Sequence, residues 1–226
     1  MPRFERLRFF ILSLWERAER RVEQAQVYIR ANQAYLLAQA RLWVGRGVFW
    51  LAGIAVGLAA VGFALLTDEA AHFFLKAVAE YPWLPFILTP AAGAGLLWIT
   101  RNYFRGAEGS GIPQVMAELK RPADIAWRPL VSLRIAVGKV LIGVAAVGSG
   151  FSFGREGPTV QIGAALMSYV GRLLPTTLRI QQHHLLVAGG AAGIAAAFNA
   201  PLAGIVFAIE ELSRSVESRM SGVVIT

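Results

Sequence analysis

Long apolar stretches alternate with short polar ones in the first half of this chain. The first uncharged run, residues 47–67, is long enough for an α-helix to cross a hydrocarbon core, which takes about 20 apolar residues. It contains a Gly-x-x-x-Gly pattern at 53–57, a weak signal for close helix packing. A second apolar run covers 84–99. The pattern predicts two membrane spans separated by polar loops at 68–82 and 100–128.

The second half of the chain has shorter and interrupted apolar segments. Residues 129–153 are apolar but contain Arg134 and Lys139, and residues 159–174 are short for a span. The run 185–209 is uncharged but is interrupted by glycines, an asparagine and a proline. Such segments are typical of discontinuous helices whose ends lie within the membrane and line a binding site. Irregular backbone is tolerated there only where it is buried in protein or lines a cavity.

The N-terminal region, residues 1–45, differs from the apolar body at 46–226. Apolar residues recur at steps of three and four between Leu7 and Ile29, which predicts an amphipathic helix with an Arg and Glu face. The apolar stretch near its start is short and lacks a small-residue cleavage site, so it is not a secretory signal. We therefore expect a peripheral cytoplasmic helix at 1–45 and a membrane domain at 46–226.

Basic residues are distributed unevenly over a chain with a formal net charge of +8. Nine arginines precede the first apolar run, one lysine lies in the first polar segment, and five basic residues lie in the second. Positive residues favour the cytoplasmic side, so the tail and second loop are expected inside and the first loop outside. A basic chain can also bind nucleic acid, but a hydrophobic content of 56% favours an integral protein of a plasma or bacterial inner membrane.

One carboxylate stands alone in the apolar second half, since Glu156 is the only acidic residue between Asp124 and Glu210. A charge in such a setting costs about 2.5–3.5 kcal/mol on insertion scales, so something must offset it. Flanking glycines and Pro158 predict a helix start here, with about half a positive charge at its amides. We predict that Glu156 is a tethered anion that fills an anion site when ionised and leaves it when protonated. The alternative is a structural pair with Arg155, although adjacent residues do not easily face each other.

Two further motifs accompany the lone carboxylate. Ser110, in Gly-Ser-Gly-Ile-Pro at 109–113, precedes a predicted helix start, where its hydroxyl can either bind an anion or serve as an ordinary N-cap. The run Phe-Asn-Ala-Pro-Leu-Ala-Gly at 198–204 starts another predicted helix. That helix ends at Glu210 and Glu211, and adjacent helical side chains point about 100° apart. We expect Glu210 to face solvent and Glu211 to face the protein interior.

Residue types that would indicate an enzyme are missing or wrongly spaced. The absence of cysteine excludes disulfides and thiolate metal sites. His183 and His184 are adjacent, which does not suit a helical metal site. No serine, histidine and aspartate arrangement can be argued. The expectation is a protein that is not an enzyme and has neither cofactor nor bound metal.

The three motifs together resemble the CLC family of chloride channels and chloride/proton antiporters. Gly-Ser-Gly-Ile-Pro, Gly-Arg-Glu-Gly-Pro-Thr-Val-Gln and Phe-Asn-Ala-Pro-Leu-Ala-Gly occur in the family's order, and the resemblance covers roughly residues 45–226. It implies an all-α polytopic membrane protein with discontinuous, tilted helices. The family is homodimeric, and each subunit builds its own anion pathway from two inverted-topology halves. This chain resembles the first half, because the family's second-half anion ligands are absent from it.

The resemblance also implies roles for individual residues. Glu156 matches the external gate and Glu211 the internal proton-transfer group, which favours chloride/proton antiport. Ser110 matches a chloride ligand and favours chloride over nitrate. The implied partners are chloride, protons and the lipid bilayer, without nucleic acid. Two alternatives stay open, a passive voltage-gated chloride channel and a non-conducting half-protein that acts as a structural or assembly unit. The full anion-binding set implied is Ser110, Gly111, Ile112, Gly154, Arg155 and Gly157.

Overall fold

The computed structural model describes residues 35, 39, 43, 46–121, 129–174 and 181–213. The chain divides into two units, Met1–Gly47 and Val48–Thr226. In the first unit the described residues are helical, and the guanidinium carbon of Arg46 lies 5.2 Å from the ring centroid of Trp43. The predicted amphipathic helix between Leu7 and Ile29 lies outside the described residues.

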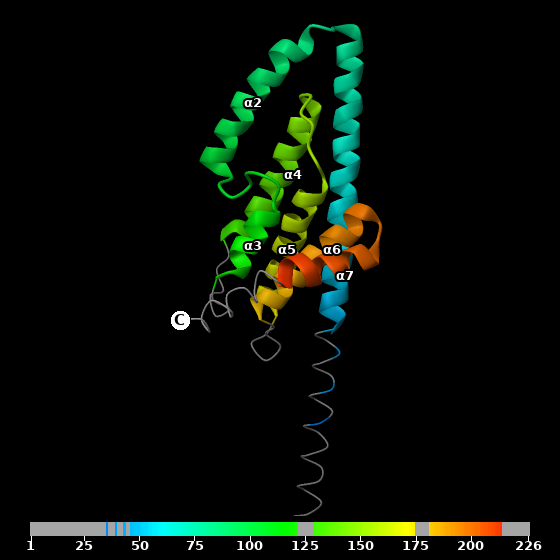
Figure 1. The fold of residues 1–226 in the computed structure, drawn as a ribbon, viewed down its shortest axis with the longest axis vertical. Helices are drawn as coiled ribbons and strands as arrows, with labels where there is room; N and C mark the ends of the chain where they lie inside the picture. Colours follow the sequence, from blue (N-terminus) through cyan, green and yellow to red (C-terminus); the bar gives the residue numbers. More distant parts are fainter. Residues whose placement is uncertain are drawn as a thin grey trace, which may run out of the picture. The chain divides into compact units, whose positions relative to one another are not determined.

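Among the residues that the structure describes, two helices have the length and composition to cross a membrane (Figure 1). The first long helix is Arg46–Glu80, with 35 residues, and the second is α2, Leu84–Tyr103, with 20 residues. Of the most apolar 18-residue stretch, only 22% is buried in the first long helix and 6% in α2. The core helix of a soluble protein is mostly buried. Both predicted spans are therefore confirmed as long, apolar and largely exposed helices.

The predicted loop at 68–82 is wrong, because the first long helix continues to Glu80. Residues 68–80 contain neither glycine nor proline, and alanine, leucine, glutamate and lysine among them favour helix. The helix ends just before Pro82, as expected from the restriction that proline places on the preceding residue. Polarity therefore marked where the apolar stretch ends, but not where the helix ends.

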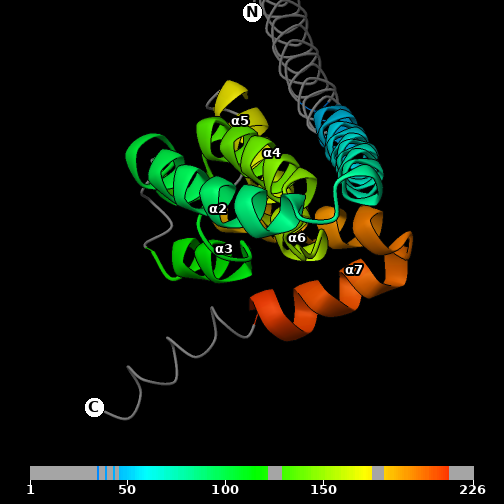
Figure 2. The same ribbon diagram turned by 90° about the horizontal axis from the view of Figure 1, so that it is seen from above.

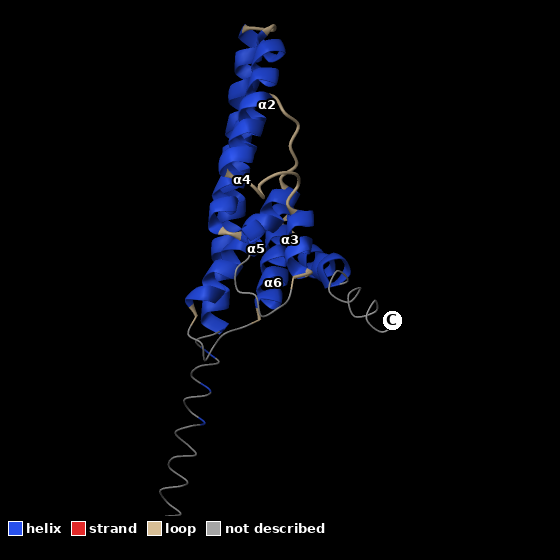
Figure 3. Cartoon of the chain, turned by 90° about the vertical axis from the view of Figure 1, so that its left-hand side faces the viewer, coloured by secondary structure: helices blue, strands red, loops and turns tan. Residues whose placement is uncertain are grey.

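The second half of the chain is built from short helices, and no strand occurs among the described residues (Figure 3). The break predicted near residue 200 is present. It falls at Asn199, whose φ of 50° is left-handed, and the next helix begins at Pro201. The elements, seen from above in Figure 2, are α3 (Ile112–Leu119), η1 (Pro129–Val131), α4 (Leu133–Gly148), α5 (Glu156–Leu173), α6 (Gln182–Phe198), α7 (Pro201–Phe207) and the π-helical segment η3 (Ala208–Ser213).

Helices α5 and α6 approach each other through glycine. A Cβ atom on Gly163 would collide with the carbonyl oxygen of Gly189, and a Cβ on Gly189 would collide with the carbonyl of Gly163. One turn further along α6, Gly193 has the same relation to the carbonyl of Thr159. Small residues at such crossings let two backbones touch, which is how helices associate where no hydrophobic effect drives them together.

The close packing predicted for Gly53 and Gly57 is not found among the described residues. A Cβ on either glycine would meet no atom within 4 Å. A Gly-x-x-x-Gly pattern reports only that one helix face is small, and the partner is decided by the tertiary fold.

The larger of two apolar clusters joins the interrupted helices, and the smaller one contains Ala52, Met167 and Leu185. Buried side chains from the first long helix, α3, α5, α6 and η3 contribute to the larger cluster. Because these elements share one core, the positions of the starts of α3 and α5 are coupled. One representative from each element is Phe63, Val115, Val160, Leu186 and Leu212.

Candidate anion site

The starts of α3 and α5 touch each other. Gly111 is the N-cap of α3 with a φ of 115°, and Gly157 is the second residue of α5. A Cβ on Gly157 would lie 2.6 Å from the carbonyl oxygen of Ser110, and a Cβ on Gly111 would lie 2.6 Å from that of Gly157. Such short separations exclude any side chain at either glycine. Two motifs that are distant in sequence are thus brought into backbone contact.

Ser110 is exposed beside this contact and does not cap α3. The N-cap is Gly111, Ile112 is the first helical residue, and Pro113 occupies the second position. The hydroxyl of Ser110 therefore makes no cap hydrogen bond, and it can donate to an anion. Of the two interpretations of Ser110, the structure is inconsistent with an ordinary N-cap.

Glu156 is the first residue of α5, two positions before Pro158. Its side chain is exposed, and one carboxylate oxygen lies 3.0 Å from the position that a Cβ on Gly154 would take. The carboxylate therefore folds back over Gly154, beyond the helix start. The hydroxyl of Thr159 donates to the carbonyl of Glu156 at 2.7 Å, which closes the first turn. A negative charge at this end of a helix is favoured by the macrodipole.

Arg155 is directed to the first long helix. Its Nη1 donates to a carboxylate oxygen of Asp68 at 2.9 Å, and it also reaches the carbonyl of Ala64 at 3.5 Å. The expected alternative, a pair between Arg155 and Glu156, does not occur, as the geometry of adjacent residues dictates. The side chains of the ion pair are 43% and 59% exposed, so it contributes little energy and mainly anchors the segment before α5.

Lys139 is a residue of this site that the motifs did not identify. It lies in α4 and is only 1% exposed. Its Nζ donates to the carbonyl oxygens of Ala107 at 2.6 Å, Gly109 at 2.9 Å and Glu108 at 3.3 Å. A peptide N–H points opposite to its C=O, so the amides of residues 108–110 point away from Nζ. One buried cation thus orders the loop that leads into Ser110.

Gln161 holds the same loop from the side of α5. Its side chain is fully buried, and Nε2 donates to the carbonyls of Gly106 and Leu130, each at 2.8 Å.

The signal for Lys139 was its position inside the apolar segment 129–153, because an ionisable residue within such a segment marks a functional site by default. The signal for Gln161 was its place at the end of the Gly-Pro-Thr-Val-Gln run. Neither signal indicates which carbonyls the side chain would bind.

The expectation that Glu211 faces the interior is wrong, because Glu210 and Glu211 are both exposed. The π-helical segment η3 explains this. Ala208 and Leu212 take its buried face, which leaves the three residues between them on the outside. No hydrogen bond or ion pair of Glu211 occurs within the described part of the chain. The structure therefore joins the first two motifs but does not bring Glu211 into contact with them.

Two long apolar helices followed by interrupted helices, two of whose starts meet, are consistent with an all-α membrane fold. A sequence profile of the family described as Voltage gated chloride channel matches residues 92–226 of the chain. The chain belongs to this family, and the matched region contains all three motifs. The family places the protein in the membrane and indicates chloride transport rather than enzymatic catalysis.

Proposed function

We propose that this chain forms part of a chloride pathway and takes part in chloride/proton antiport. Glu156 is the external gate, and Glu211 is the internal proton-transfer group. The observation that supports the proposal best is the contact of Ser110 with Gly157, which brings together two helix starts, the Ser110 hydroxyl and the segment that carries Glu156. Helix N-termini attract anions through their unpaired amides and positive dipole ends. The ligand is chloride, and no cofactor is required.

Competition between chloride and the Glu156 carboxylate would couple the two ions. Two monovalent anions about 4 Å apart repel each other by roughly 4 kcal/mol at an effective dielectric constant of 20. Ionised Glu156 and chloride therefore exclude each other from one site. Protonation neutralises Glu156 and lets chloride enter, and the proton then leaves toward the outside. Glu211 supplies the next proton from the inside, so that one ion cannot complete its passage without the other.

Replacing Glu156 by glutamine is expected to separate chloride flux from the pH gradient, because an amide cannot carry a proton. Proteoliposomes would be loaded with chloride, and their reversal potential would be measured with and without a pH gradient. The variant should show a reversal potential that no longer shifts with pH. Glu69→Gln, an exposed carboxylate on the first long helix, is the matched control and should keep the wild-type shift. Intact proton coupling in Glu156→Gln would refute the gate assignment.

Replacing Glu211 by glutamine is expected to leave chloride flux in place and to abolish proton transport. Glu210→Gln is the control, because its side chain is the adjacent exposed carboxylate on the same segment. Proton uptake would be followed with a pH electrode while chloride efflux is recorded in parallel. Proton transport by Glu211→Gln at the Glu210→Gln rate would remove Glu211 from the mechanism.

A structural or assembly unit is the second candidate, and the exposed apolar side chains near α7 favour it. Proteoliposomes that contain only this chain would decide, since an absence of chloride efflux would favour assembly over transport. A reversal potential insensitive to pH in the wild-type chain would instead indicate a passive channel. The exposed apolar residues near α7 are Phe198, Leu202, Ile205, Val206 and Ile209.

We further propose a cytoplasmic N-terminus, a plasma or bacterial inner membrane, and a homodimeric assembly.

A further inference from the structure

A pocket of about 290 Å³ lies where the end of α2 meets η1 and the start of α4. Arg105 and Arg134 line it from two different segments. Tyr103, Pro129 and Ser132 are among its other walls, and no carboxylate is found among the lining residues that the structure describes. Two arginines in one pocket, with no acidic residue among its described walls, are chemically suited to an anion.

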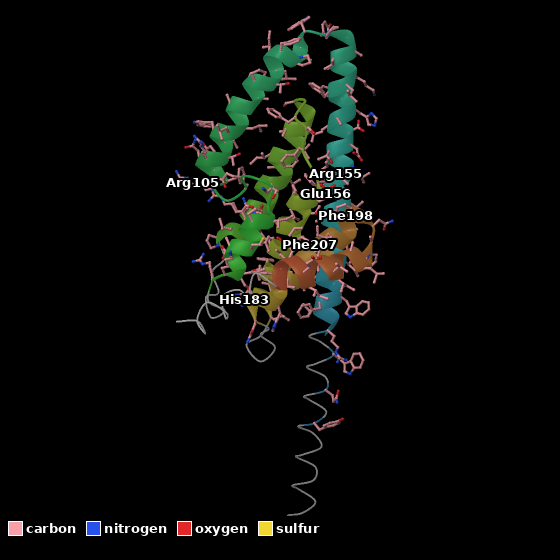
Figure 4. The ribbon with its side chains drawn as sticks, in the orientation of Figure 1. Arg105, Arg155, Glu156, His183, Phe198 and Phe207 are labelled. Carbon is pink, nitrogen blue, oxygen red and sulfur yellow. The ribbon has the colours of Figure 1, made fainter. Side chains whose placement is uncertain are left out.

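The two arginines are available to a ligand. The Nε of Arg105, a residue labelled in Figure 4, donates to the carbonyl of Arg101 at 2.8 Å, which orients the guanidinium, and its terminal nitrogens make no hydrogen bond or ion pair with the described residues. Arg134 is exposed, and it makes no hydrogen bond or ion pair within the described residues. Guanidinium groups bind phosphate oxygens through two parallel N–H bonds, which gives both strength and orientation. The nearest acidic residue along the chain, Glu108, accepts from the amide of Gly106 at 2.5 Å.

The start of α4 adds to the positive potential of the pocket. Ser132 is the N-cap of this 16-residue helix and makes no side-chain cap hydrogen bond. The Ser132 hydroxyl therefore does not occupy the first amides of α4, and the helix dipole is positive at this end.

The position of the pocket identifies the source of the phosphate. It lies at the end of α2, which is one of the two helices able to span the membrane. Trp98 and Tyr103 are both exposed there, with their rings edge to face and 5.7 Å between centroids. Exposed tryptophan and tyrosine near the end of a span are typical of the headgroup level. Basic pockets between transmembrane helices are known sites for anionic headgroups.

We propose that this pocket binds the phosphate group of an anionic membrane lipid. Arg105 and Arg134 hold the phosphate oxygens, and the start of α4 contributes its amide dipoles. A lipid bound here would link the end of α2 to α4. The proposal does not depend on proton coupling or on the roles of Glu156 and Glu211.

Native mass spectrometry of the chain in an uncharged detergent would test the proposal, with phosphatidylglycerol and phosphatidylcholine as the probes. We expect saturable phosphatidylglycerol binding, about tenfold tighter than that of phosphatidylcholine. Arg105→Gln and Arg134→Gln should each weaken it about fivefold, the effect of one basic group near an anionic lipid. Arg101→Gln loses the same charge one turn earlier, outside the pocket, and should change binding less than twofold. All three arginines are exposed, so we expect the variants to fold.

Three results would overturn the lipid site. Equal affinity for the two lipids would show that the pocket does not select an anionic headgroup. An equal loss in Arg101→Gln would show a diffuse surface potential instead of a pocket. A third arm adds inorganic phosphate. If millimolar phosphate displaces phosphatidylglycerol from the wild type but has no effect on residual binding in the arginine variants, the ligand is free phosphate.

Discussion

Replacing Lys139 by methionine is expected to lower the free energy of unfolding by about 3–5 kcal/mol, because it removes the buried ammonium donor that three carbonyl groups share. Hydrogen bonds to a charged group contribute roughly 1.5–3 kcal/mol each. The loss is smaller than their sum, since methionine also avoids the cost of burying an ammonium group. The three carbonyls belong to Ala107, Glu108 and Gly109, so the damage falls on the loop that ends at Ser110.

The same substitution is expected to abolish chloride flux even in molecules that remain folded. Without the cation, the carbonyls can rotate toward water, and the loop amides then lose their common direction. Thermal unfolding in detergent and chloride efflux from proteoliposomes would measure the two effects separately. Lys76→Met is the matched control, because Lys76 is exposed on the first long helix and should change stability by less than about 0.5 kcal/mol. Wild-type stability and flux in Lys139→Met would show that the loop is ordered without it.

Replacing Gly189 by alanine is expected to lower the free energy of unfolding by about 3 kcal/mol, the upper end of the range for overpacking. The new methyl group would collide with the carbonyl of Gly163, which is backbone and cannot rotate away. Helices α5 and α6 would have to separate, and the core that contains Val160 and Leu186 would open with them. Thermal unfolding of the purified chain would report the loss.

Gly62→Ala is a control variant for which we expect stability to change in the opposite direction. Gly62 lies in the first long helix, and a Cβ there would meet no atom within 4 Å. Alanine is favoured over glycine within a helix by about 1 kcal/mol, so this variant should be slightly more stable than the wild type. Equal stability changes in Gly189→Ala and Gly62→Ala would mean that α5 and α6 do not pack as closely as described.

Local chemistry explains which parts of the fold were predictable. The two spans follow from uninterrupted apolar composition, and the break before α7 follows from Asn199 and Pro201, whose backbone preferences act within a few residues. The starts of α3 and α5 were likewise indicated by glycine beside proline. The end of the first long helix was missed because residues 68–80 carry four charges but still favour helix.

Side-chain direction could not be derived in the same way. Arg155 pairs with Asp68, which is distant in sequence, so only the packing of α5 beside the first long helix determines the partner. The exposure of Glu211 depends on the π-helical turn that puts Leu212 into the core. The Gly-x-x-x-Gly pattern at 53–57 had the right residues for close packing, but no described atom lies within 4 Å of a Cβ at either glycine.

The amino-acid sequence by itself determined the membrane class, the family motifs and the lone carboxylate, because composition and local backbone preference are properties of neighbouring residues. The tertiary structure alone decided that Gly157 touches Ser110 and that Lys139 binds the carbonyls leading into Ser110. Those contacts join segments far apart in the chain, and they form only when α3, α4 and α5 pack around one core. The physical reason is that a buried cation and a backbone contact through glycine depend on distances in space, which no local pattern records.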